Sequence, residues 1–162
     1  MFDVNVKGML FGMQEAAKHF MPAGGGTIIN MLSTAGVRQH PLQAVYSTSK
    51  AATAQMTRLA ALQYGKHKIR VNGICPTMVK TALARQYVNS EPLRNLVLGS
   101  IPPGRFAEVS DVVTVATFLA SDEAGFITGA LIPVDGGETR LCTFRASASG
   151  SAAMLRRLEG TI

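Results

Sequence analysis

The sequence is poor in the residues that mark several classes of protein. It has no tryptophan, and only 16% of its residues are charged. Its two cysteines, Cys75 and Cys142, lie far apart and have no histidine partner at metal-ligand spacing. This excludes a disulfide-rich scaffold and a cysteine-based zinc motif, and it favours free thiols in a reducing compartment. We therefore expect a cytoplasmic protein.

Long apolar runs, targeting signals and metal-binding clusters are also missing. The nearest candidate for a membrane span, residues 112–120, is shorter than the roughly 20 residues that a membrane helix needs. Residues 1–4 do not show the basic stretch and apolar core of a signal peptide. The histidines stand singly, at His19, His40 and His67, so we expect neither a membrane anchor nor a metal site.

Dense basic patches are absent from most of the chain, although its net charge is +6. Residues 1–139 contain twelve Lys and Arg against nine Asp and Glu, a net charge of +3. Residues 140–162 contribute the other +3, from four Arg and one Glu. Half of the excess charge thus lies in a short tail, and no basic stripe is interleaved with aromatic residues. We therefore do not expect nucleic acid as a partner.

What the chain does contain is a 47% share of hydrophobic residues, arranged in helical and extended patterns. Apolar residues at helical spacing predict helices over 2–20, 44–64 and 108–120. A further helix is expected around 82–88, within a segment, 77–104, that is otherwise irregular. Short apolar stretches predict buried strands over 27–31, 69–75 and 127–134. On the helix 44–64, one side is expected to carry Ala52, Met56, Leu59 and Gln63. The alternation implies parallel strands joined by crossover helices in an α/β domain.

The C-terminal residues differ in composition from this domain. Ser, Ala and Arg dominate residues 138–162. We predict that the folded domain occupies residues 1–137. Residues 138–162 would then form a basic tail of low order, with a short helix at 152–158.

One spacing carries a chemical meaning. Tyr46 and Lys50 lie four residues apart on a predicted helix, so their side chains share one face, one turn apart. A phenol is a poor proton donor or acceptor at neutral pH, and a neighbouring ammonium favours its ionised form. Such a pair can exchange a proton with a substrate oxygen. The spacing alone also occurs by chance on many helices.

Two strand ends converge on the same place. Ser33 follows the strand 27–31 and lies thirteen residues before Tyr46, and the next strand ends at Pro76. Ligands of open α/β sheets bind beyond the carboxyl ends of the strands. We therefore expect Ser33, Tyr46, Lys50 and the loop 76–81 to form one site.

These stretches resemble a classical short-chain dehydrogenase/reductase over about residues 2–138. The matching stretches are Val4-Asn-Val-Lys-Gly8, the strand ending at Ser33, Tyr46-Ser-Thr-Ser-Lys50, Ile69-Arg-Val-Asn72 with Pro76, Phe118-Leu-Ala-Ser-Asp122, Ile127-Thr-Gly129 and Val134-Asp-Gly-Gly137. The resemblance implies the C-terminal portion of that family's domain. Its fold would be a partial Rossmann-like, doubly wound parallel sheet of three strands with crossover helices.

The resemblance also implies roles for single residues. Tyr46 would be the general acid/base, and Lys50 would favour its ionised form and hold the nicotinamide ribose. Ser33 would hydrogen-bond the reacting oxygen, and Asn5 would anchor a water that relays protons; Asn5 can also be a mere backbone-pairing residue early in a helix. The positions that would contact the nicotinamide end of NAD or NADP, besides Tyr46 and Lys50, are Pro76, Thr77, Val79 and Thr81.

The implied reaction is hydride transfer between NAD(P) and a small-molecule secondary alcohol or ketone. The implied assembly is a homo-oligomer, a dimer or tetramer, formed through the helices around 6–20 and 46–64. The sequence departs from the family in two ways. It has no glycine-rich turn between a strand and a helix to hold a pyrophosphate, so the strand 27–31 is expected at an exposed sheet edge. Thr77 also stands where the family usually has glycine, so the loop is expected to differ there.

Two readings of the function follow. In the first, the chain is an NAD(P)-dependent oxidoreductase of the short-chain type. In the second, it is a catalytically incompetent truncated paralogue that acts only through oligomer contacts, or a gene-model fragment. The sequence does not distinguish NAD from NADP, and it does not specify the substrate.

Overall fold

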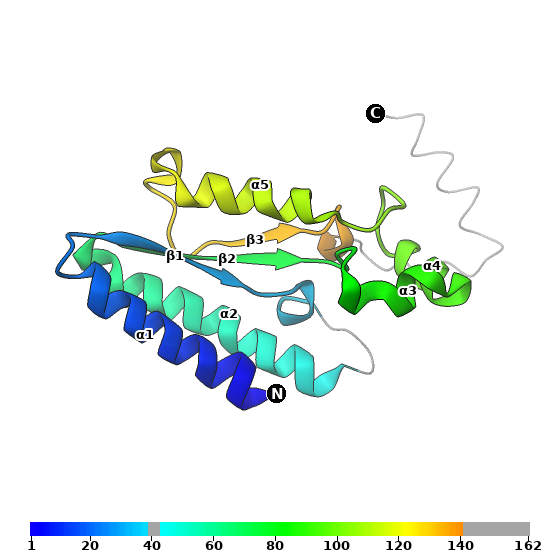
Figure 1. Ribbon diagram of the computed structural model, residues 1–162, viewed down its shortest axis with the longest axis horizontal. Coiled ribbons are helices and arrows are strands. Elements are labelled where there is room, and N and C mark those ends of the chain that lie inside the picture. Colours follow the sequence, from blue (N-terminus) through cyan, green and yellow to red (C-terminus); the bar gives the residue numbers. More distant parts are fainter. Residues whose placement is uncertain (39–42, 141–162) are drawn as a thin grey trace.

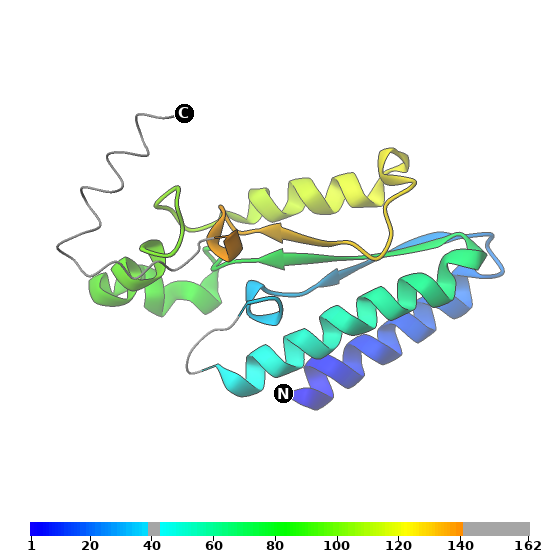
Figure 2. The ribbon, with the colours of Figure 1, turned by 180° about the vertical axis from the view of Figure 1, so that it is seen from behind.

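The computed structural model describes residues 1–38 and 43–140, and it has three layers (Figure 1). The middle layer is a parallel sheet of three strands in the order β1-β2-β3. Its strands are β1 (Gly26–Met31), β2 (Ile69–Pro76) and β3 (Leu131–Val134). Helices α1 (Gly8–Phe20) and α2 (Ala44–Tyr64) cover one face, and α5 (Val109–Ala120) covers the other, as Figure 2 shows from behind.

The central strand β2 explains why both faces need a helical cover. Its side chains alternate between the two faces, as they must in a strand. Ile69 and Val71 pack among residues of α1 and α2, whereas Ile74 packs against Val112 and Leu119 of α5. A strand that is apolar on both sides is stable only between two layers. The predicted α/β class and the partial, doubly wound parallel sheet are thereby confirmed.

The two crossover connections have opposite hands. The strands follow one another across the sheet in a single direction, from β1 to β2 to β3. The helix α2, which connects β1 to β2, lies on one face of the sheet, and α5, which connects β2 to β3, lies on the other. Two crossovers that step the same way over opposite faces must differ in hand. Since right-handed crossovers strongly predominate in proteins, one of the two departs from the usual hand. This departure places α5 over the face that α1 and α2 leave bare.

The first predicted helix forms, but its first turn is irregular. Residues Asp3–Lys7 form a π-helical turn, η1, before α1 begins. Met13 and Ala17 are buried as the pattern requires, whereas Phe2 is exposed. The wider π turn changes the angular spacing of side chains, so residues before Gly8 do not continue the apolar face of α1.

The buried side of α2 overlaps only partly with the predicted side: Met56 packs against the core and Ala52 is half-buried. Leu59 and Gln63 are exposed, and the helix buries small side chains instead. These are Ser49, Thr53, Ala54, Thr57, Ala60 and Ala61. The Thr57 hydroxyl donates to the carbonyl of Thr53 (2.8 Å) and accepts from the Asn30 amide (2.9 Å), so it is buried without an unpaired group. Small residues let α2 lie close to the sheet, which a pattern based on large apolar residues does not detect.

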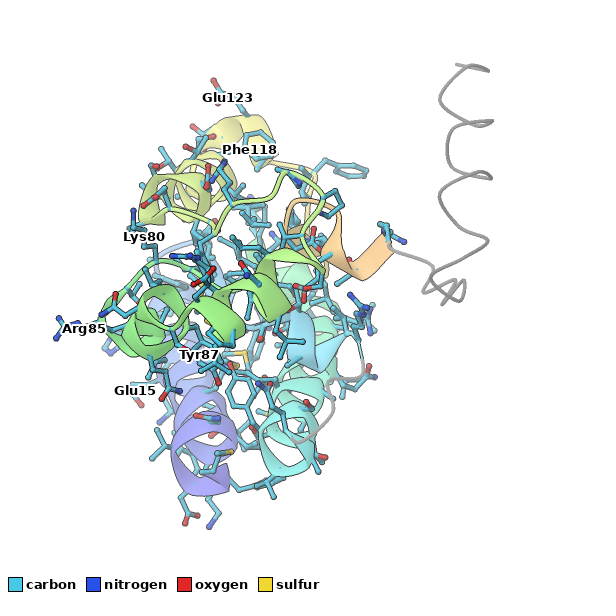
Figure 3. All side chains as sticks on the ribbon, turned by 90° about the vertical axis from the view of Figure 1, so that its right-hand side faces the viewer. Glu15, Lys80, Arg85, Tyr87, Phe118 and Glu123 are labelled. Carbon is cyan, nitrogen blue, oxygen red and sulfur yellow. The ribbon has the colours of Figure 1, made fainter. Side chains whose placement is uncertain are left out.

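The segment after β2 contains more helix than predicted. The turn η4 (Ala82–Ala84) and helix α3 (Arg85–Asn89) match the prediction around 82–88, but a further helix, α4 (Glu91–Leu98), follows. The latter has proline in its first turn, a position that suits helix initiation. Leu93, Leu96 and Val97 recur at helical spacing, but none of the residues of this short helix is buried. Figure 3 looks onto this segment, which carries Arg85 and Tyr87.

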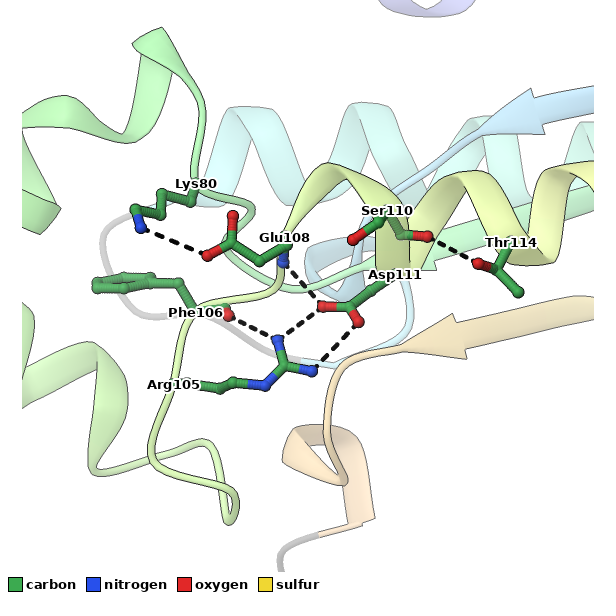
Figure 4. Close-up of polar contacts among 7 residues, drawn as sticks. All are labelled: Lys80, Arg105, Phe106, Glu108, Ser110, Asp111 and Thr114. Atoms are coloured by element: carbon green, nitrogen blue, oxygen red, sulfur yellow. Dashed lines mark hydrogen bonds and ion pairs between the residues drawn. The ribbon is translucent and has the colours of Figure 1, made fainter.

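Helix α5 begins at a capping box. The Glu108 side chain accepts from the third helical residue, Asp111, whose own carboxylate accepts from the Glu108 backbone (2.8 Å). The Arg105 guanidinium donates two hydrogen bonds to the same carboxylate, at 2.7 and 3.1 Å (Figure 4). The hydrogen bond from Arg105 is the main reason why the pKa of Asp111 falls to about 2. The backbone N–H groups of Glu108 and Asp111 are thus both paired with side-chain carboxylates where the helix starts.

The last strand is shorter than predicted, because it begins at Leu131 and not at residue 127. The intervening residues are bonded to side chains. The Asn72 amide donates to the Ile127 carbonyl (2.8 Å), its oxygen accepts from the Ala130 backbone (3.0 Å), and the Thr128 hydroxyl accepts from the Val71 backbone (3.0 Å). Two backbone bonds to β2 accompany them, from Gly129 to the Val71 carbonyl and from Gly73 to the Ala130 carbonyl (both 2.8 Å). The left-handed Gly129 (φ 73°) turns the chain into β3.

Two remaining expectations concern other parts of the chain. Strand β1 pairs only with β2 among the described residues, so it forms an edge of the sheet, as predicted. The tail helix predicted at 152–158 lies outside the described residues. Within residues 1–38 and 43–140, no helix is both long and apolar enough to cross a bilayer.

We predict that Asn72→Ala destabilises the domain by roughly 2–4 kcal/mol, because it leaves two partly buried backbone groups without partners, the Ile127 carbonyl and the Ala130 N–H. The side chain is fully buried, so water cannot replace it. Urea denaturation followed by circular dichroism measures the change. The matched control is Asn95→Ala, on the exposed side of α4, which should change the unfolding free energy little. Equal losses for the two variants would contradict this account of residues 127–130.

Candidate functional site

The predicted site residues lie at the carboxyl edge of the sheet, where Figure 1 places the arrowheads of the strands and the start of α2. Ser33 follows β1, and Pro76 is the last residue of β2. Tyr46 and Lys50 lie in the first two turns of α2. The fold thus brings these four residues to one edge, as the strand order requires.

Lys50 contacts both Tyr46 and the end of β1. Its Nζ atom lies 5.9 Å from the centre of the Tyr46 ring, within the range of a cation–π contact. The same atom donates a hydrogen bond of 3.0 Å to the carbonyl oxygen of Met31. Partial burial lowers the pKa of Lys50, because it disfavours the charged form. The ammonium therefore lies between the phenol ring and the strand end.

The carbonyl that Lys50 contacts belongs to the open edge of β1. In a parallel ladder, alternate residues turn their backbone groups toward opposite neighbours. The Leu32 backbone donates to Ile74 of β2 (2.8 Å), so the preceding residue, Met31, points away from β2. Lys50 thus satisfies a carbonyl that has no strand partner among the described residues.

Ser33 begins a tight turn that packs on α2. The turn is a 3₁₀ helix, η2 (Thr34–Gly36), and Ser33 caps it by accepting a bond from the Ala35 backbone at 3.2 Å. This bond occupies a lone pair of the hydroxyl oxygen and leaves its hydrogen free to donate. The cap fixes the Ser33 side chain relative to the turn.

Asn5 is connected to this site through Ser49. The Asn5 amide donates to the Ser49 hydroxyl (3.1 Å), which in turn donates to the backbone carbonyl of Tyr46 (2.7 Å). Ser49 is fully buried, so the chain of bonds ties η1 firmly to the first turns of α2. Sequence reasoning missed Ser49, although it lies between the two catalytic candidates and has a hydroxyl suited to such a link.

The Tyr46 hydroxyl is left available. Within the described residues it makes no hydrogen bond, to Ser33, to Lys50 or to any other group. Tyr46 borders an open cavity of about 500 Å³, together with Met1 and residues 43–45. The structure therefore brings the phenol to a solvent-filled space but does not pair its oxygen with Ser33.

The four predicted cofactor contacts after β2 fall into different environments. Pro76 is buried and Thr77 half-buried, and the Thr77 backbone donates to Val134 (3.2 Å) with a negative φ. Val79 packs among the apolar residues on the α5 side of the sheet. Thr81 is exposed at the start of η4. Of these residues, Pro76 and Thr77 lie nearest along the chain to the strand end.

A second cavity, of about 550 Å³, lies apart from Tyr46. It is lined by residues before and within α5 and by the turn after β3, among them Arg105, Asp111 and Asp135. Thr77 also lines it, but Ser33 and Lys50 do not. Asp135 is buried and accepts bonds from the Gly137 and Thr139 backbones, so it holds the turn in place.

Fold and site together define a class of protein. A phenol beside an ammonium, at the carboxyl edge of a parallel sheet, is suited to proton exchange with an oxygen on a small ligand. A serine hydroxyl on the adjoining turn is suited to bind that same oxygen. The fold itself is that of a Rossmann-like α/β domain.

Comparisons with known proteins identify this class more closely. Residues 1–139 match the family described as Enoyl-(Acyl carrier protein) reductase. The 4-formylbenzenesulfonate dehydrogenase TsaC1/TsaC2 of Comamonas testosteroni is 37% identical over 139 residues, which cover 84% of this chain and 55% of that protein. The L-xylulose reductase of Mus musculus is 39% identical over 137 residues, covering 84% and 56%.

Solved structures agree with the sequence matches. A short-chain dehydrogenase/reductase from Mycobacterium ulcerans superposes with a TM-score of 0.84 at 34% identity, covering 86% of this chain and 50% of that one. A gluconate 5-dehydrogenase from Burkholderia cenocepacia, in complex with NADP and tartrate, gives a TM-score of 0.82 at 30% identity, covering 85% and 54%. The chain belongs to the short-chain dehydrogenase/reductase family. It spans about half the length of the curated relatives it matches.

The residues present fit one end of a nicotinamide dinucleotide. Lys50 offers an ammonium, and Ser33 and Tyr46 offer hydroxyls, at an edge suited to a ribose and a carboxamide. No glycine-rich turn opens a helix among the described residues, so they supply no cradle for the pyrophosphate. The fit is therefore to the nicotinamide-ribose end.

Cys75 is a buried residue in contact with the turn that carries Ser33. It is fully buried near the end of β2, against Leu32 and Ala54. Burial raises the pKa of its thiol to about 11, and a hydrogen bond from the Ser33 backbone offsets part of that shift. The thiol is thus kept neutral and contacts the turn that carries Ser33.

We predict that Cys75 in the folded protein is alkylated much more slowly than in the unfolded chain, because its thiol is fully buried and burial raises its pKa to about 11. A free thiol would begin to react near its ordinary pKa of 9.0, because the thiolate is the nucleophile. The rate of iodoacetamide labelling, followed by mass spectrometry in a Cys142→Ser background, measures this difference. The same protein unfolded in urea is the control and should titrate near pH 9. A native labelling rate equal to that of the unfolded protein would contradict the burial of the thiol.

Proposed function

We propose that this chain supplies the proton-transferring half of an NAD(P)-dependent oxidoreductase that interconverts a secondary alcohol and a ketone. The observation that carries the proposal is the position of Lys50, whose ammonium contacts the Tyr46 ring and the strand end that precedes Ser33. Family membership supports the reaction type. Relatives solved with NADP, such as the gluconate 5-dehydrogenase, support the cofactor class.

In this mechanism Tyr46 is the general acid and base. Its hydroxyl donates a proton to the ketone oxygen during reduction and removes one from the alcohol during oxidation. The ammonium of Lys50 stabilises the phenolate that remains. When bound, the nicotinamide supplies or accepts the hydride. Tyr46 is half-buried and its hydroxyl is free of other described partners, which suits a group that must meet a ligand.

Ser33 and Asn5 have supporting roles. The Ser33 hydroxyl keeps a free hydrogen while its oxygen is held by Ala35, so it can donate to the same substrate oxygen as Tyr46. The Asn5 amide holds the first turns of α2 through Ser49, and its oxygen remains to anchor a water for proton relay. Tyr46, Lys50, Pro76 and Thr77 would contact the nicotinamide end of NAD or NADP; Val79 and Thr81 would contribute through the loop backbone.

We predict that Tyr46→Phe lowers turnover by about 10²–10⁴-fold, the usual contribution of a general acid or base. Cofactor affinity, measured from NADH and NADPH fluorescence, should change little, because only one hydroxyl is lost. The matched control is Tyr64→Phe, at the far end of the same helix, which should retain turnover.

Two outcomes would count against this proposal. Turnover retained in Tyr46→Phe would refute the role of the phenol. A lack of saturable binding of either cofactor by the unmodified chain would refute the oxidoreductase assignment for the chain as it stands. The second result would favour the alternative, a catalytically incompetent paralogue or a gene-model fragment.

We further propose that the chain forms a homo-oligomer, a dimer or tetramer, through α1 and α2. The outward sides of both helices carry large apolar side chains that the sheet does not cover. Phe11 of α1 is 61% exposed, and Leu59 and Leu62 of α2 are 53% and 82% exposed. Apolar side chains gathered on neighbouring helices are typical of a surface that binds another protein.

We predict that Leu62→Asp shifts the protein toward the monomer, because a carboxylate at the centre of an apolar interface is desolvated without a partner. Sedimentation velocity measures the distribution of species. The control is Leu83→Asp, at a residue of η4 that is even more exposed (91%) but lies away from α1 and α2. A monomeric parent, or an equal effect of both substitutions, would contradict an interface through these helices.

A further inference from the structure

Gly36 lies where the turn that carries Ser33 contacts α2. The turn is rigid, because successive backbone groups within it are bonded: Gly36 donates to Ser33 (3.0 Å), and Val37 and Arg38 donate to Thr34 (3.0 and 2.8 Å). Ser33 and Gly36 therefore move together. Thr34 and Ala35 are nearly inaccessible to solvent, so this turn is packed into the protein and does not lie loosely on its surface.

There is no space for a side chain at Gly36. A Cβ atom built there would lie 2.7 Å from the carbonyl oxygen of Lys50 and 2.8 Å from its carbonyl carbon. Both are backbone atoms in the middle of a helix, so no side-chain rotation can relieve the contact. The same carbonyl also accepts a bond from the Thr53 hydroxyl (2.9 Å), which holds it further in place.

The requirement for glycine here is spatial and not conformational. The glycines with positive φ among the described residues are Gly24, Gly25, Gly104, Gly129, Gly136 and Gly137. Gly36 is not one of them, so its backbone conformation is open to alanine. A methyl group at this position would act as a wedge between the turn and Lys50, with no other change to the chain.

The other end of the turn is also held. The Arg38 guanidinium, two residues beyond Gly36, donates to the backbone carbonyl of Glu138, which follows β3. The turn is thus confined between α2 on one side and the segment after β3 on the other. It cannot retreat from a wedge at Gly36 without losing this bond.

From this confinement we infer that Gly36 is a positioning residue, which sets the distance between the Ser33 hydroxyl and the Tyr46–Lys50 pair. The inference rests on the function proposed above and extends it to a residue that touches neither substrate nor cofactor. To reach an ordinary contact of 3.4 Å, the turn must move by about 0.7 Å in the Gly36→Ala variant. A displacement of about 1 Å between reacting groups can lower a rate by about a hundredfold.

The test compares Gly36→Ala with Gly65→Ala. The latter adds the same methyl group at the end of α2, where nothing lies within 4 Å and φ is also negative. Both variants are made in a Cys142→Ser background, so that Cys75 is the single thiol. Two quantities are measured in each: the kcat and KM for turnover with NADH or NADPH, and the rate at which Cys75 is alkylated in the native state.

The expected result for Gly36→Ala is a fall in kcat of about tenfold to a hundredfold, with the KM for the cofactor little changed. Alkylation of Cys75 should also accelerate, because the Ser33 turn contacts this buried thiol. Gly65→Ala should match the parent in both measurements. A kcat within about twofold of the parent for Gly36→Ala would overturn the inference.

A third variant tests whether faster alkylation of Cys75 reflects displacement of the turn or a general loss of stability. Leu119→Ala creates a cavity in the cluster on the opposite face of the sheet, which does not include Cys75. If it accelerates the alkylation of Cys75 as much as Gly36→Ala at a matched loss of Tm, the effect is global and the inference fails.

The two proposals fail in different ways. If the parent shows no turnover and no cofactor binding, the proposed function fails, and the alkylation rates alone then decide whether Gly36 sets the spacing. If the parent turns over and Gly36→Ala matches it in both measurements, the proposed function stands and the role of Gly36 is refuted.

Discussion

The site depends on how closely α2 approaches the sheet and the turn after β1. That approach is possible because the inner side of the helix carries serine, threonine and alanine, with glycine opposite it at residue 36. The hydroxyls of Ser49, Thr53 and Thr57 each find a backbone or amide partner, whereas the buried hydroxyl of Ser47 has no hydrogen-bond partner among the described residues. A larger side chain on either surface would separate the Ser33 turn from Tyr46 and Lys50.

Much of the fold could be predicted from the sequence, because its strongest signals are local. The bounds of helix 44–64 match the structure, since apolar and small residues run without a break and Gly65 follows them. The strand 69–75 was recognisable because its residues alternate, with Ile69, Val71 and Cys75 on one face. The carboxyl-edge position of Ser33, Tyr46 and Lys50 followed from the strand order, which a parallel sheet imposes.

The errors arose where tertiary contacts outweigh local pattern. The buried face of α2 was predicted only in part, because Leu59 is turned outward and Thr57 inward. The start of β3 was placed too early, because residues 127–130 bond to β2 partly through the side chains of Asn72 and Thr128 and form no regular ladder. Helix α4 was missed because it has no buried stripe. The link through Ser49 depends on a partner 44 positions away, which no local pattern contains.

The bond between Lys50 and Met31 also limits the register of any strand that adds to β1. The backbone groups of Gly26 and Leu32 point to β2, so those of Thr27, Ile29 and Met31 point to the bare edge. The last of these carbonyls is already occupied by the ammonium. An added strand could therefore hydrogen-bond fully at Thr27 and Ile29 but would have to end, or displace Lys50, at Met31. The lysine proposed to assist Tyr46 would thus also terminate the edge.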